Sequence, residues 1–537
     1  MNANYLPPNR RYRLPLYLSV LYALGPTTFW LIVFGAILWI LPDWTWRIKV
    51  AVRAEAGLIL LGTLGIWRYS WYMINVVRSA IYSRMVFPSL RFNARAQQNP
   101  FPQRVYFLIP SYFEDENVSI RVFRALVREA ASVPALVKAF ISVGSDEEEA
   151  HIRNICAQAP GSERLQLRFL RQNQGKRLAM GDALRAIAHE RQRDRMAVAH
   201  AFTDDSYNDV VVFMDGDTEM AQGTLARCVP YFKAYTRVGA ITTDEMLGKI
   251  FKASWLVRSW FSLKFVKRHS VMKSHSLSRR VLTLTGRYSA FRADAVMTEE
   301  FVRHLEDDHI YNWVFGRIRF LMGDDKSTWF SLIKNKWDML YLPDTMIYSL
   351  ETRSKGFFSQ ALSLMYRWHG NTLRNSARSI ALGPKGTGGF FIWMCILDQR
   401  ISMWTTLVAP IAMILLIIFI TPWFAAFYAA WLILIRLIQL WILVLQGHRM
   451  TISDMFLQLF DQWVGSFVKI LALFSLGKQR WGKAKGQSVG DLAWYAAWVP
   501  TFLAVFYIML LILGVGLLTD VFNLPDYLTL RQLFARL

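Results

Sequence analysis

The stretch DVVVFMDGD, residues 209 to 217, decides the fold of this 537-residue chain. It has the length of a buried β-strand and ends in a polar cluster. A second such run, RVYFLIP at 104 to 110, lies upstream, and helical patterns such as VSIRVFRALVREA alternate with shorter apolar runs such as ALVKAFISV. This alternation predicts an α/β fold with a mostly parallel, helix-flanked sheet. Ligands of such sheets bind at the carboxyl ends of the strands, where the polar clusters fall.

Two carboxylates close the 209 to 217 stretch. Asp215 and Asp217, separated only by Gly216, could hold a divalent cation against a diphosphate. Hard oxygen ligands of this kind suit Mg²⁺ or Mn²⁺. For these three residues taken alone, an Asp-Gly turn after a buried strand is an equally good interpretation.

A second acidic pair, Asp324 and Asp325, occurs in the stretch GDDK further along the chain. Adjacent carboxylates repel each other unless one is protonated or a cation is near, so one of them could be a general base that deprotonates an acceptor hydroxyl. A solvated helix N-terminus is the alternative, because Asp is favoured there by capping and by the helix dipole. A third acidic run, Glu306 to Asp308, could assist the site or be a solvated surface.

Arg367 and Trp368 occur in the stretch LMYRWHGNTLR. An Arg can clamp a pyrophosphate, and a Trp offers a flat face on which a sugar ring can stack. Alone, the stretch is also typical of an amphipathic helix with a Trp at a membrane interface.

Long apolar segments at both ends of the chain predict a membrane protein. An apolar content of 54% with 19% charged residues excludes both an ordinary soluble enzyme and a pure membrane bundle. Segments of about 20 apolar residues are expected to span the bilayer, namely 18 to 41, 56 to 77, 401 to 421, 423 to 446 and 491 to 518. The stretch 452 to 476 is interpreted as an interfacial helix, with a span as the alternative, and 389 to 400 is also placed at the interface.

These segments divide the chain into three parts. Residues 1 to 83 form N-terminal transmembrane helices, 84 to 385 a cytosolic domain, and 386 to 537 interfacial and C-terminal transmembrane helices. Basic residues place the central domain on the cytosolic side, because clusters of Lys and Arg are favoured there. They follow the second helix and precede the last one: Arg78, Arg84, Arg91 and Arg95, then Lys478, Arg480, Lys483 and Lys485.

The charge of the chain favours anionic partners. With 62 Lys and Arg against 39 Asp and Glu, the formal net charge is +23, which suits lipid headgroups, nucleotide phosphates or an acidic product. Nucleic acid is not expected, because none of its binding motifs occurs. The three cysteines are far apart and predict neither a disulfide framework nor a zinc site.

Two arginines, Arg68 and Arg436, fall near the middle of predicted spans. A cation at that depth is costly unless it faces a water-filled path or a partner. A polyanion leaving through the membrane would be such a partner. Snorkelling, or pairing with a buried carboxylate, is the alternative interpretation.

Six motifs in order resemble the processive family-2 glycosyltransferases that make cellulose, hyaluronan, chitin and alginate: VYFLIPSYFEDE, NQGKRLAM, VVVFMDGDTEM, TLTGRYSAFR, GDDKSTWF and LMYRWHGN. The resemblance covers most of the chain, including the membrane pattern. Further stretches, among them GIWRYSWY, LYLPD and DQRISMWTT, are most similar to the catalytic subunit of alginate polymerases, or mannuronan synthases. The resemblance implies a GT-A type transferase domain between transmembrane helices, in the inner membrane of a Gram-negative bacterium.

The implied reaction is inverting polymerisation of mannuronate from GDP-mannuronate, coupled to export of the anionic polysaccharide. A synthase that uses a UDP-sugar, and a non-catalytic membrane scaffold that only binds nucleotide, remain alternatives. The resemblance also implies a cyclic di-GMP-sensing PilZ-type co-polymerase subunit, since the chain carries no PilZ motif, and a periplasmic and outer-membrane export complex.

The resemblance gives roles to individual residues. The nucleotide-sugar is bound by Pro110, Ser111 and Tyr112 at the base, and by Lys176, Arg177 and Arg367 with Asp215 at the diphosphate. The metal, Mg²⁺ or Mn²⁺, is held by Asp215 and Asp217. The acceptor site is lined by Gly286, Arg287, Tyr288 and Trp368. Asp325, with Asp324 beside it, matches the catalytic base.

The sequence departs from the family pattern at two places. Leu364 replaces the Gln of the family's QxxRW motif, and Ser142-Val143 replace the paired aspartates that usually precede a Gly-Ser turn, here Gly144-Ser145. The acid that contacts the nucleotide base is therefore expected to be Asp146 or Glu147.

Overall fold

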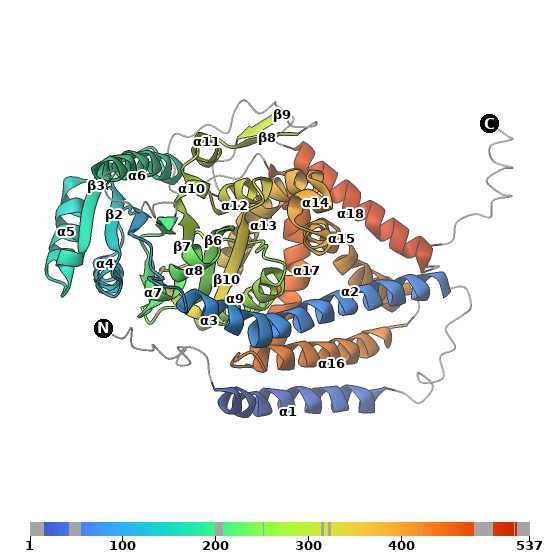
Figure 1. Ribbon diagram of the computed structural model, residues 1–537. Helices are drawn as coiled ribbons and strands as arrows, with labels where there is room; N and C mark the ends of the chain where they lie inside the picture. The colour runs from blue at the N-terminus through green and yellow to red at the C-terminus, as the bar shows by residue number, and fades with distance from the viewer. Residues whose placement is uncertain are drawn as a thin grey trace. The chain divides into compact units, whose positions relative to one another are not determined.

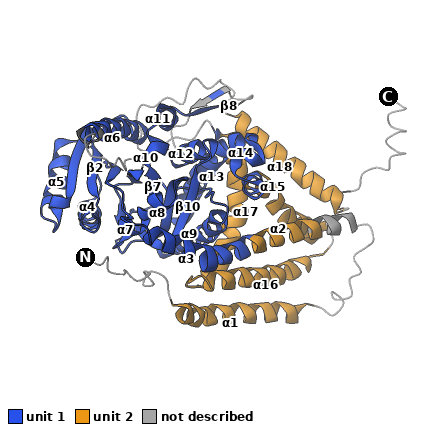
Figure 2. Ribbon diagram, viewed as in Figure 1, with its two compact units in different colours: residues 1–13, 75–398, 476–493 blue, residues 14–74, 399–475, 494–537 orange. Residues whose placement is uncertain are grey.

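The computed structural model describes residues 15–41, 55–198, 208–250, 252–312, 316–319, 324–419, 421–476, 498–519 and 521–522. Its contacts divide the chain into two compact units (Figures 1 and 2). The first is built on Asn75–Asp398 and contains the sheet. The second gathers helices from Leu14–Ile74, Gln399–Ser475 and Trp494–Leu537.

The first unit is built on a sheet with the strand order β3-β2-β1-β4-β7-β6-β10-β5. Strands β3, β2, β1 and β4 run parallel, as do β6 and β10. Strand β7 is antiparallel to both neighbours and β5 to β10, so the sheet is mixed rather than mostly parallel. Its strands are β1 (Arg104–Pro110), β2 (Leu136–Val143), β3 (Leu165–Arg171), β4 (Val210–Met214), β5 (Thr218–Met220), β6 (Val238–Leu247), β7 (Tyr288–Arg292) and β10 (Asp338–Ser349).

Both apolar runs that the sequence predicts as strands are strands, and they are buried on both faces. Alternate residues of β1, such as Phe107 and Ile109, pack with Val122 of helix α4 (Glu116–Ala131). Helix α6 (Lys176–Val198) packs on β1 and β2 from the other face (Figure 1). The sheet is therefore covered by helices on both sides, as expected of an α/β domain.

Shorter elements complete the first unit. They are the π-helix Tyr82–Val86, the 3₁₀ turn Ser162–Arg164, the hairpin of β8 (His309–Asn312) and β9 (Gly316–Arg319), and the helices α3 (Phe87–Arg95), α5 (Asp146–Ala157), α7 (Thr224–Cys228), α8 (Pro230–Ala234), α9 (Trp255–Ser276), α10 (Ala293–Val296), α11 (Glu299–Glu306), α12 (Asp324–Lys334), α13 (Phe357–Ala381) and α14 (Gly383–Thr387).

Strand pairing places three sequence motifs side by side. Strand β4 lies between β1, its parallel neighbour, and β7, its antiparallel neighbour. The carboxyl ends of β1 and β4 therefore meet the amino end of β7. Ser111, Asp215 and Arg287, which directly adjoin these three strand ends, are brought together from distant parts of the sequence.

Five helices are long and apolar enough to cross a membrane within the described residues: α1 (Leu16–Ile40), α15 (Phe390–Phe419), α16 (Phe424–Val444), α17 (Ser453–Phe474) and α18 (Val499–Leu518). Helix α2 (Glu55–Ile81) forms where the second span is predicted but is not among the five, because Arg68 and several polar residues dilute its apolar character. The stretch 389 to 400 is not a separate interfacial segment, since it continues into α15. The predicted interfacial helix at 452 to 476 is α17, which is long enough for a span.

Arg68 and Arg436, the two arginines within predicted spans, have polar partners inside the second unit. Arg68 donates a hydrogen bond to the hydroxyl of Thr405. Arg436 donates to Oε1 of Gln439 at 2.6 Å and to Oε1 of Gln462. The hydroxyl of Thr405 and the side-chain amides of Gln439 and Gln462 are neutral hydrogen-bond acceptors.

Candidate functional site

The site begins where β1 and β4 end. A Cβ at Gly216 would lie only 3.2 Å from the carbonyl oxygen of Pro110 and 3.3 Å from Cα of Ser111. A side chain at this position would therefore push the two loops apart, which explains the glycine between the aspartates. On the other side, the backbone N–H of Asp215 donates to the carbonyl of Arg287 at 3.1 Å. The DGD turn is fixed between the predicted base-binding and acceptor motifs.

Gly286 is the point at which the predicted donor, metal and base residues converge. A Cβ at this glycine would lie 3.8 Å from Nζ of Lys176, 3.9 Å from Cβ of Asp325 and 4.0 Å from Oδ2 of Asp215. Lys176 also lies 2.8 Å from Oδ1 of Asp215. Three motifs that are far apart in the sequence thus surround one glycine.

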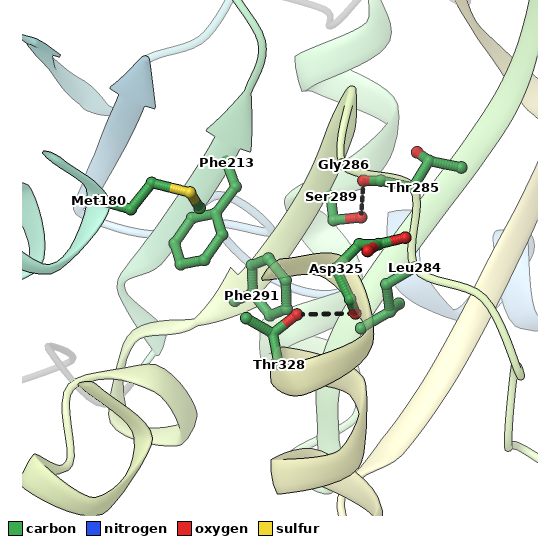
Figure 3. A pocket seen from close by; sticks show the side chains of 9 residues that line it. All are labelled: Met180, Phe213, Leu284, Thr285, Gly286, Ser289, Phe291, Asp325 and Thr328. Carbon is green, nitrogen blue, oxygen red and sulfur yellow. Dashed lines mark hydrogen bonds between the residues drawn. The ribbon is translucent and has the colours of Figure 1, made fainter. Parts of the chain in front are cut away.

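A small pocket opens beside this glycine. Figure 3 shows Asp325 and Gly286 on its wall, with the hydroxyl of Thr328 donating to the carbonyl of Asp325 at 3.0 Å. The wall is formed by Met180, Phe213, Leu284, Thr285, Gly286, Ser289, Phe291, Asp325 and Thr328. Four of these residues have apolar side chains, three carry hydroxyl groups, and Asp325 is the one carboxylate of the wall.

Asp217 is a buried carboxylate with an unsatisfied oxygen. Burial raises its pKa to about 6, and the nearby charge of Asp215 acts in the same direction. Its Oδ1 has no hydrogen-bond partner, although buried polar atoms are nearly always paired. A divalent cation held by Asp217 and Asp215 would remove this penalty.

Asp215 and Asp217 suit a Mg²⁺ or Mn²⁺ ion that is held only partly by the protein, rather than one enclosed by protein ligands. Within the described ranges, no cluster of three or more acidic, His or Cys side chains could hold an ion. Mg²⁺ is usually bound by one or two carboxylates together with substrate phosphates and water. The pair Asp215 and Asp217 has that character.

Arg287 belongs to a buried network of alternating charges. Its guanidinium pairs with Glu245 at the end of β6 and with Glu351 after β10, and Glu351 also pairs with Arg353. Burial would raise the pKa of Glu245, but the charges of Arg287 and Arg268 hold it below its usual value. Arg287 thus lies beside the predicted acceptor motif as a buried, ionised side chain.

Arg353 shows that positive charge is crowded near the aspartates. Burial and the charges of Arg287 and Arg367 lower its pKa to about 10, while Asp217 opposes that shift. Three arginines therefore lie within electrostatic range of each other. A dianionic diphosphate placed among them would relieve their repulsion.

Two predicted site residues have their side chains elsewhere. Tyr288 is fully buried in the hydrophobic core, because side chains alternate along a strand and its neighbour Ser289 faces the pocket. Arg177 is buried and donates to the carbonyls of Leu305 and His304 and, at 3.2 Å, to Ser327. The Tyr288 side chain thus packs in the core instead of facing the pocket, and Arg177 donates to carbonyls at the end of helix α11.

Helix α12 carries the predicted base into the pocket. Asp325 is its second residue, and Nδ2 of Asn371 on α13 donates to Oδ1 of Asp325 at 2.8 Å. The next residue, Lys326, is buried and donates to the carbonyl of Leu282 and to Thr283. Burial lowers the pKa of Lys326 to about 8. Asp324 begins the helix, but its side chain lies outside the described residues.

Asp308, the buried residue of the third acidic run, has a structural role. Asp308 accepts a bidentate pair of hydrogen bonds from Arg378 of α13, at 2.8 and 2.6 Å, and one from Ser327 of α12 at 2.6 Å. Burial would raise its pKa, but these donors keep it below the usual value. Asp308 therefore ties α12 to α13, while Glu306 pairs with Arg185 on the surface.

Trp368 already stacks on one face. Its ring lies 5.7 Å from that of Trp260 at an interplanar angle of 17°, and Nζ of Lys264 lies 5.6 Å from the Trp368 ring centre. A sugar could stack only on the opposite face. Leu364, which replaces the family's Gln, is buried in the same helix.

The acid beside the predicted base-binding loop is Glu148. Its carboxylate accepts from the hydroxyl of Ser111 at 2.8 Å and from the backbone N–H groups of Phe113 and Gly144, both at 3.0 Å. The sequence instead favoured Asp146 or Glu147. Asp146 is 92% exposed and pairs with Arg171, and the Glu147 side chain is also directed to solvent.

A local signal could have found Glu148. Ser145 caps helix α5 by accepting from the backbone N–H of Glu148, and Ser-x-x-Glu is the capping-box pattern, in which the fourth residue bends back over the N-terminus. Beside it, Tyr112 and Phe113 are 48% and 61% exposed and form an edge-to-face pair at 4.9 Å. These rings are available to stack on a planar ligand.

Other residues of the site were missed altogether. Glu245 ends β6 in the stretch TTDEML, and Glu351 and Arg353 follow β10. Glu245 lies in a polar cluster near the carboxyl end of β6, and Glu351 and Arg353 form another directly after β10. Polar clusters at the carboxyl ends of β1 and β4 were the signal by which the sequence predicted the ligand site. Asn371 carried no signal, because its contact with Asp325 depends on how α12 and α13 pack.

The chain is similar in sequence to known glycosyltransferases. Residues 102–371 match the family model described as "Glycosyltransferase like family 2". A protein named glycosyltransferase alg8 from Pseudomonas syringae pv. tomato is 33% identical over 84% of this chain and 88% of its own length. A protein of the same name from Azotobacter vinelandii is 31% identical over 89% of this chain and 94% of its own.

Among solved structures, a mannosyltransferase from Pyrobaculum calidifontis, in complex with GDP-Man and Mn²⁺, is similar at a TM-score of 0.43 and 15% identity. The match covers 76% of this chain and 97% of that one.

Proposed function

The chain belongs to glycosyltransferase family 2, and from this premise we propose that it polymerises mannuronate from GDP-mannuronate into the precursor of alginate. Its relatives over most of its length make it an alginate-type glycosyltransferase. The observation that carries the proposal is the convergence of Lys176, Asp215 and Asp325 around Gly286. A donor diphosphate at the first two residues would present its sugar to the third.

Asp325 acts as the general base in this proposal. It takes the proton from the acceptor hydroxyl, the hydroxyl oxygen bonds to the anomeric carbon from the face opposite the diphosphate, and the bond from that carbon to the diphosphate oxygen breaks. Its electron pair leaves with GDP, and the anomeric configuration is inverted. The apolar side chains of the pocket wall, Met180, Phe213, Leu284 and Phe291, limit the access of water, which would otherwise compete with the acceptor.

The donor is bound by groups of opposite charge. Asp215 and Asp217 would hold Mg²⁺ or Mn²⁺, which when bound neutralises the diphosphate and helps it to leave. Lys176, Arg353 and Arg367 supply further positive charge on the protein side. The guanine ring would lie against Tyr112 and Phe113, with Glu148 available to its N–H donors.

Export is the second half of the proposal. The transferase unit lies in the cytosol, the helices lie in the bacterial inner membrane, and the growing anionic chain passes among them. Arg68 and Arg436 would offer it positive charge. A cyclic di-GMP-sensing PilZ-type subunit and an export complex in the periplasm and outer membrane would complete the system.

The proposal is tested in inner-membrane vesicles that contain this chain and its PilZ-type partner, with Mg²⁺ and cyclic di-GMP. GDP-mannuronate and UDP-sugars are supplied in turn, and polymer is identified by digestion with an alginate lyase. Polymer from GDP-mannuronate alone supports the assignment. Polymer from a UDP-sugar would contradict the substrate but keep the site, and nucleotide binding without turnover of any donor would contradict the enzymatic assignment.

A further inference from the structure

Helix α13 reaches the catalytic base directly. Nδ2 of Asn371 donates a hydrogen bond to Oδ1 of Asp325 at 2.8 Å. We propose that Asn371 is a positioning residue, which holds the Asp325 carboxylate in the orientation that accepts the acceptor proton and thereby links acceptor binding to proton removal. This inference rests on the proposed function, since it gives Asp325 the role of base.

The position of Asn371 on its helix supports this link. It follows Arg367 by four residues and Trp368 by three, and residues at these spacings lie on the same face of a helix. One face of α13 therefore presents a cation, an aromatic ring and an amide donor toward the site. An acceptor sugar stacked on Trp368 would be fixed relative to the base by the rigid helix itself.

The two helices that carry the pair are held together independently of any ligand. Asp308 binds Arg378 of α13 and Ser327 of α12 at the same carboxylate. Within α13, Nδ2 of Asn375 donates to the carbonyl of Asn371 at 3.2 Å. The distance between Asp325 and Asn371 is thus set before the substrates bind, which is the arrangement expected of a preorganised base.

An amide suits this position chemically. It donates one hydrogen bond, which fixes a carboxylate rotamer, but it carries no charge that would suppress the basicity of Asp325. An Asp in its place would have nearly the same shape and the opposite effect, because two carboxylates at hydrogen-bond distance share a proton and one is hard to ionise. The exchange of Asn371 for Asp therefore tests the contact with almost no change in packing.

The experiment measures donor turnover against pH for wild type, Asn371→Asp, Asn371→Ala and the control Asn375→Ala, in the vesicles described above. Asn375 is one turn away on the same helix; it donates to the carbonyl of Asn371 and accepts from Arg378, so its loss perturbs the helix packing without removing a contact with Asp325. We expect both Asn371 variants to lower kcat about 10- to 100-fold at neutral pH with little change in donor KM. In Asn371→Asp the acidic limb moves to higher pH by about one unit or more, so that part of the activity returns at alkaline pH.

A merely structural role would give a different result. If Asn371→Asp showed the wild-type pH profile, or if Asn375→Ala lost as much kcat with the same profile, the positioning role would be overturned. Unchanged binding of GDP shows that the variants are folded. Failure of the proposed function looks different, because the wild type itself would then not turn over GDP-mannuronate; the same comparison is then made with the donor that it does use.

Discussion

The ammonium group of Lys176 lies 2.8 Å from Oδ1 of Asp215, and both groups adjoin the open space beside Gly286. The pair couples the amino end of α6 to the DGD turn after β4. An arriving metal and diphosphate would replace this contact, with Asp215 turning to the metal and Lys176 to a phosphate oxygen. The site is thus charge-paired at rest and can exchange its pairs for those with the donor.

Gly286→Ala is expected to fold normally and lose activity. The new methyl group would meet its neighbours at 3.8 to 4.0 Å, which is ordinary van der Waals contact. It would nevertheless occupy the space between Lys176 and Asp325, so turnover should fall at least about tenfold, as for a small misplacement of reacting groups. Gly356→Ala, where a Cβ meets nothing within 4 Å, is the matched control. Equal activity of both variants would contradict the placement of the reacting groups.

Asp217→Asn should stabilise the protein while abolishing transfer. The folded-state pKa of Asp217 is about 6, above its ordinary value of 3.8. The stability that comes from protonation is complete below the ordinary value and lost as the pH rises through 6, so at pH 7.5 the native state holds an unfavourable buried charge. Without Mg²⁺, the variant should melt about 2 to 4 °C higher than wild type at pH 7.5.

Metal ions and protons should compete for the Asp217 carboxylate. Below about pH 6, protonation of Asp217 should weaken donor binding, and higher Mg²⁺ should move this midpoint to lower pH because the metal competes with the proton. Added Mg²⁺ should also raise the melting temperature of the wild type but not of Asp217→Asn. A metal-independent midpoint, or equal stabilisation of both proteins by Mg²⁺, would contradict the metal assignment.

Glu148→Gln should weaken donor binding selectively. Glu148 accepts two hydrogen bonds from the Ser111 loop and a third from Gly144 after β2, and hydrogen bonds to a charged group contribute about 1.5 to 3 kcal/mol each. The donor KM should rise about tenfold or more, with a smaller change in kcat. Asp146→Asn and Glu147→Gln are controls on the same helix turn and should keep the wild-type KM. A greater effect in either control would restore the acid that the sequence favoured.

Arg436→Leu should reduce polymer export and leave GDP binding intact. Its guanidinium donates to Gln439 and Gln462 inside the second unit, so the variant removes a positive charge far from the nucleotide site in sequence. Vesicle assays would compare lyase-sensitive polymer inside and outside the membrane, with Arg436→Lys as the charge-retaining control. Unchanged export by Arg436→Leu would count against a path for the anionic product at this arginine.

The sequence predicts most of the fold because the relevant signals are local. The apolar runs before Pro110 and Asp215 are buried strands, and the paired acids do follow a strand and begin a helix. The antiparallel insertion of β7 carries no local signal. Its consequences, the burial of Tyr288 and the pairing of Arg287 with Glu245, could therefore not be predicted.

Side-chain direction separates the predicted site residues that lie together from those that do not. Lys176 and Arg177 are neighbours in one motif, yet Lys176 contacts Asp215 while Arg177 donates to the carbonyl of Leu305 at the end of helix α11. Adjacent helical residues differ in direction by about 100°, so a motif alone does not say which one faces the ligand. The choice of Glu148 over its neighbours has the same origin.

The most direct test of the account is to compare Asp325→Asn with the wild type for GDP binding and for polymer formation from GDP-mannuronate, with Asp307→Asn as the control. The account predicts equal GDP affinity for all three proteins and a loss of polymer in Asp325→Asn alone, by at least about 100-fold, since general-base catalysis contributes that much or more. Polymer formation by Asp325→Asn at the wild-type rate would contradict the assignment of this residue as the base and the site built around it.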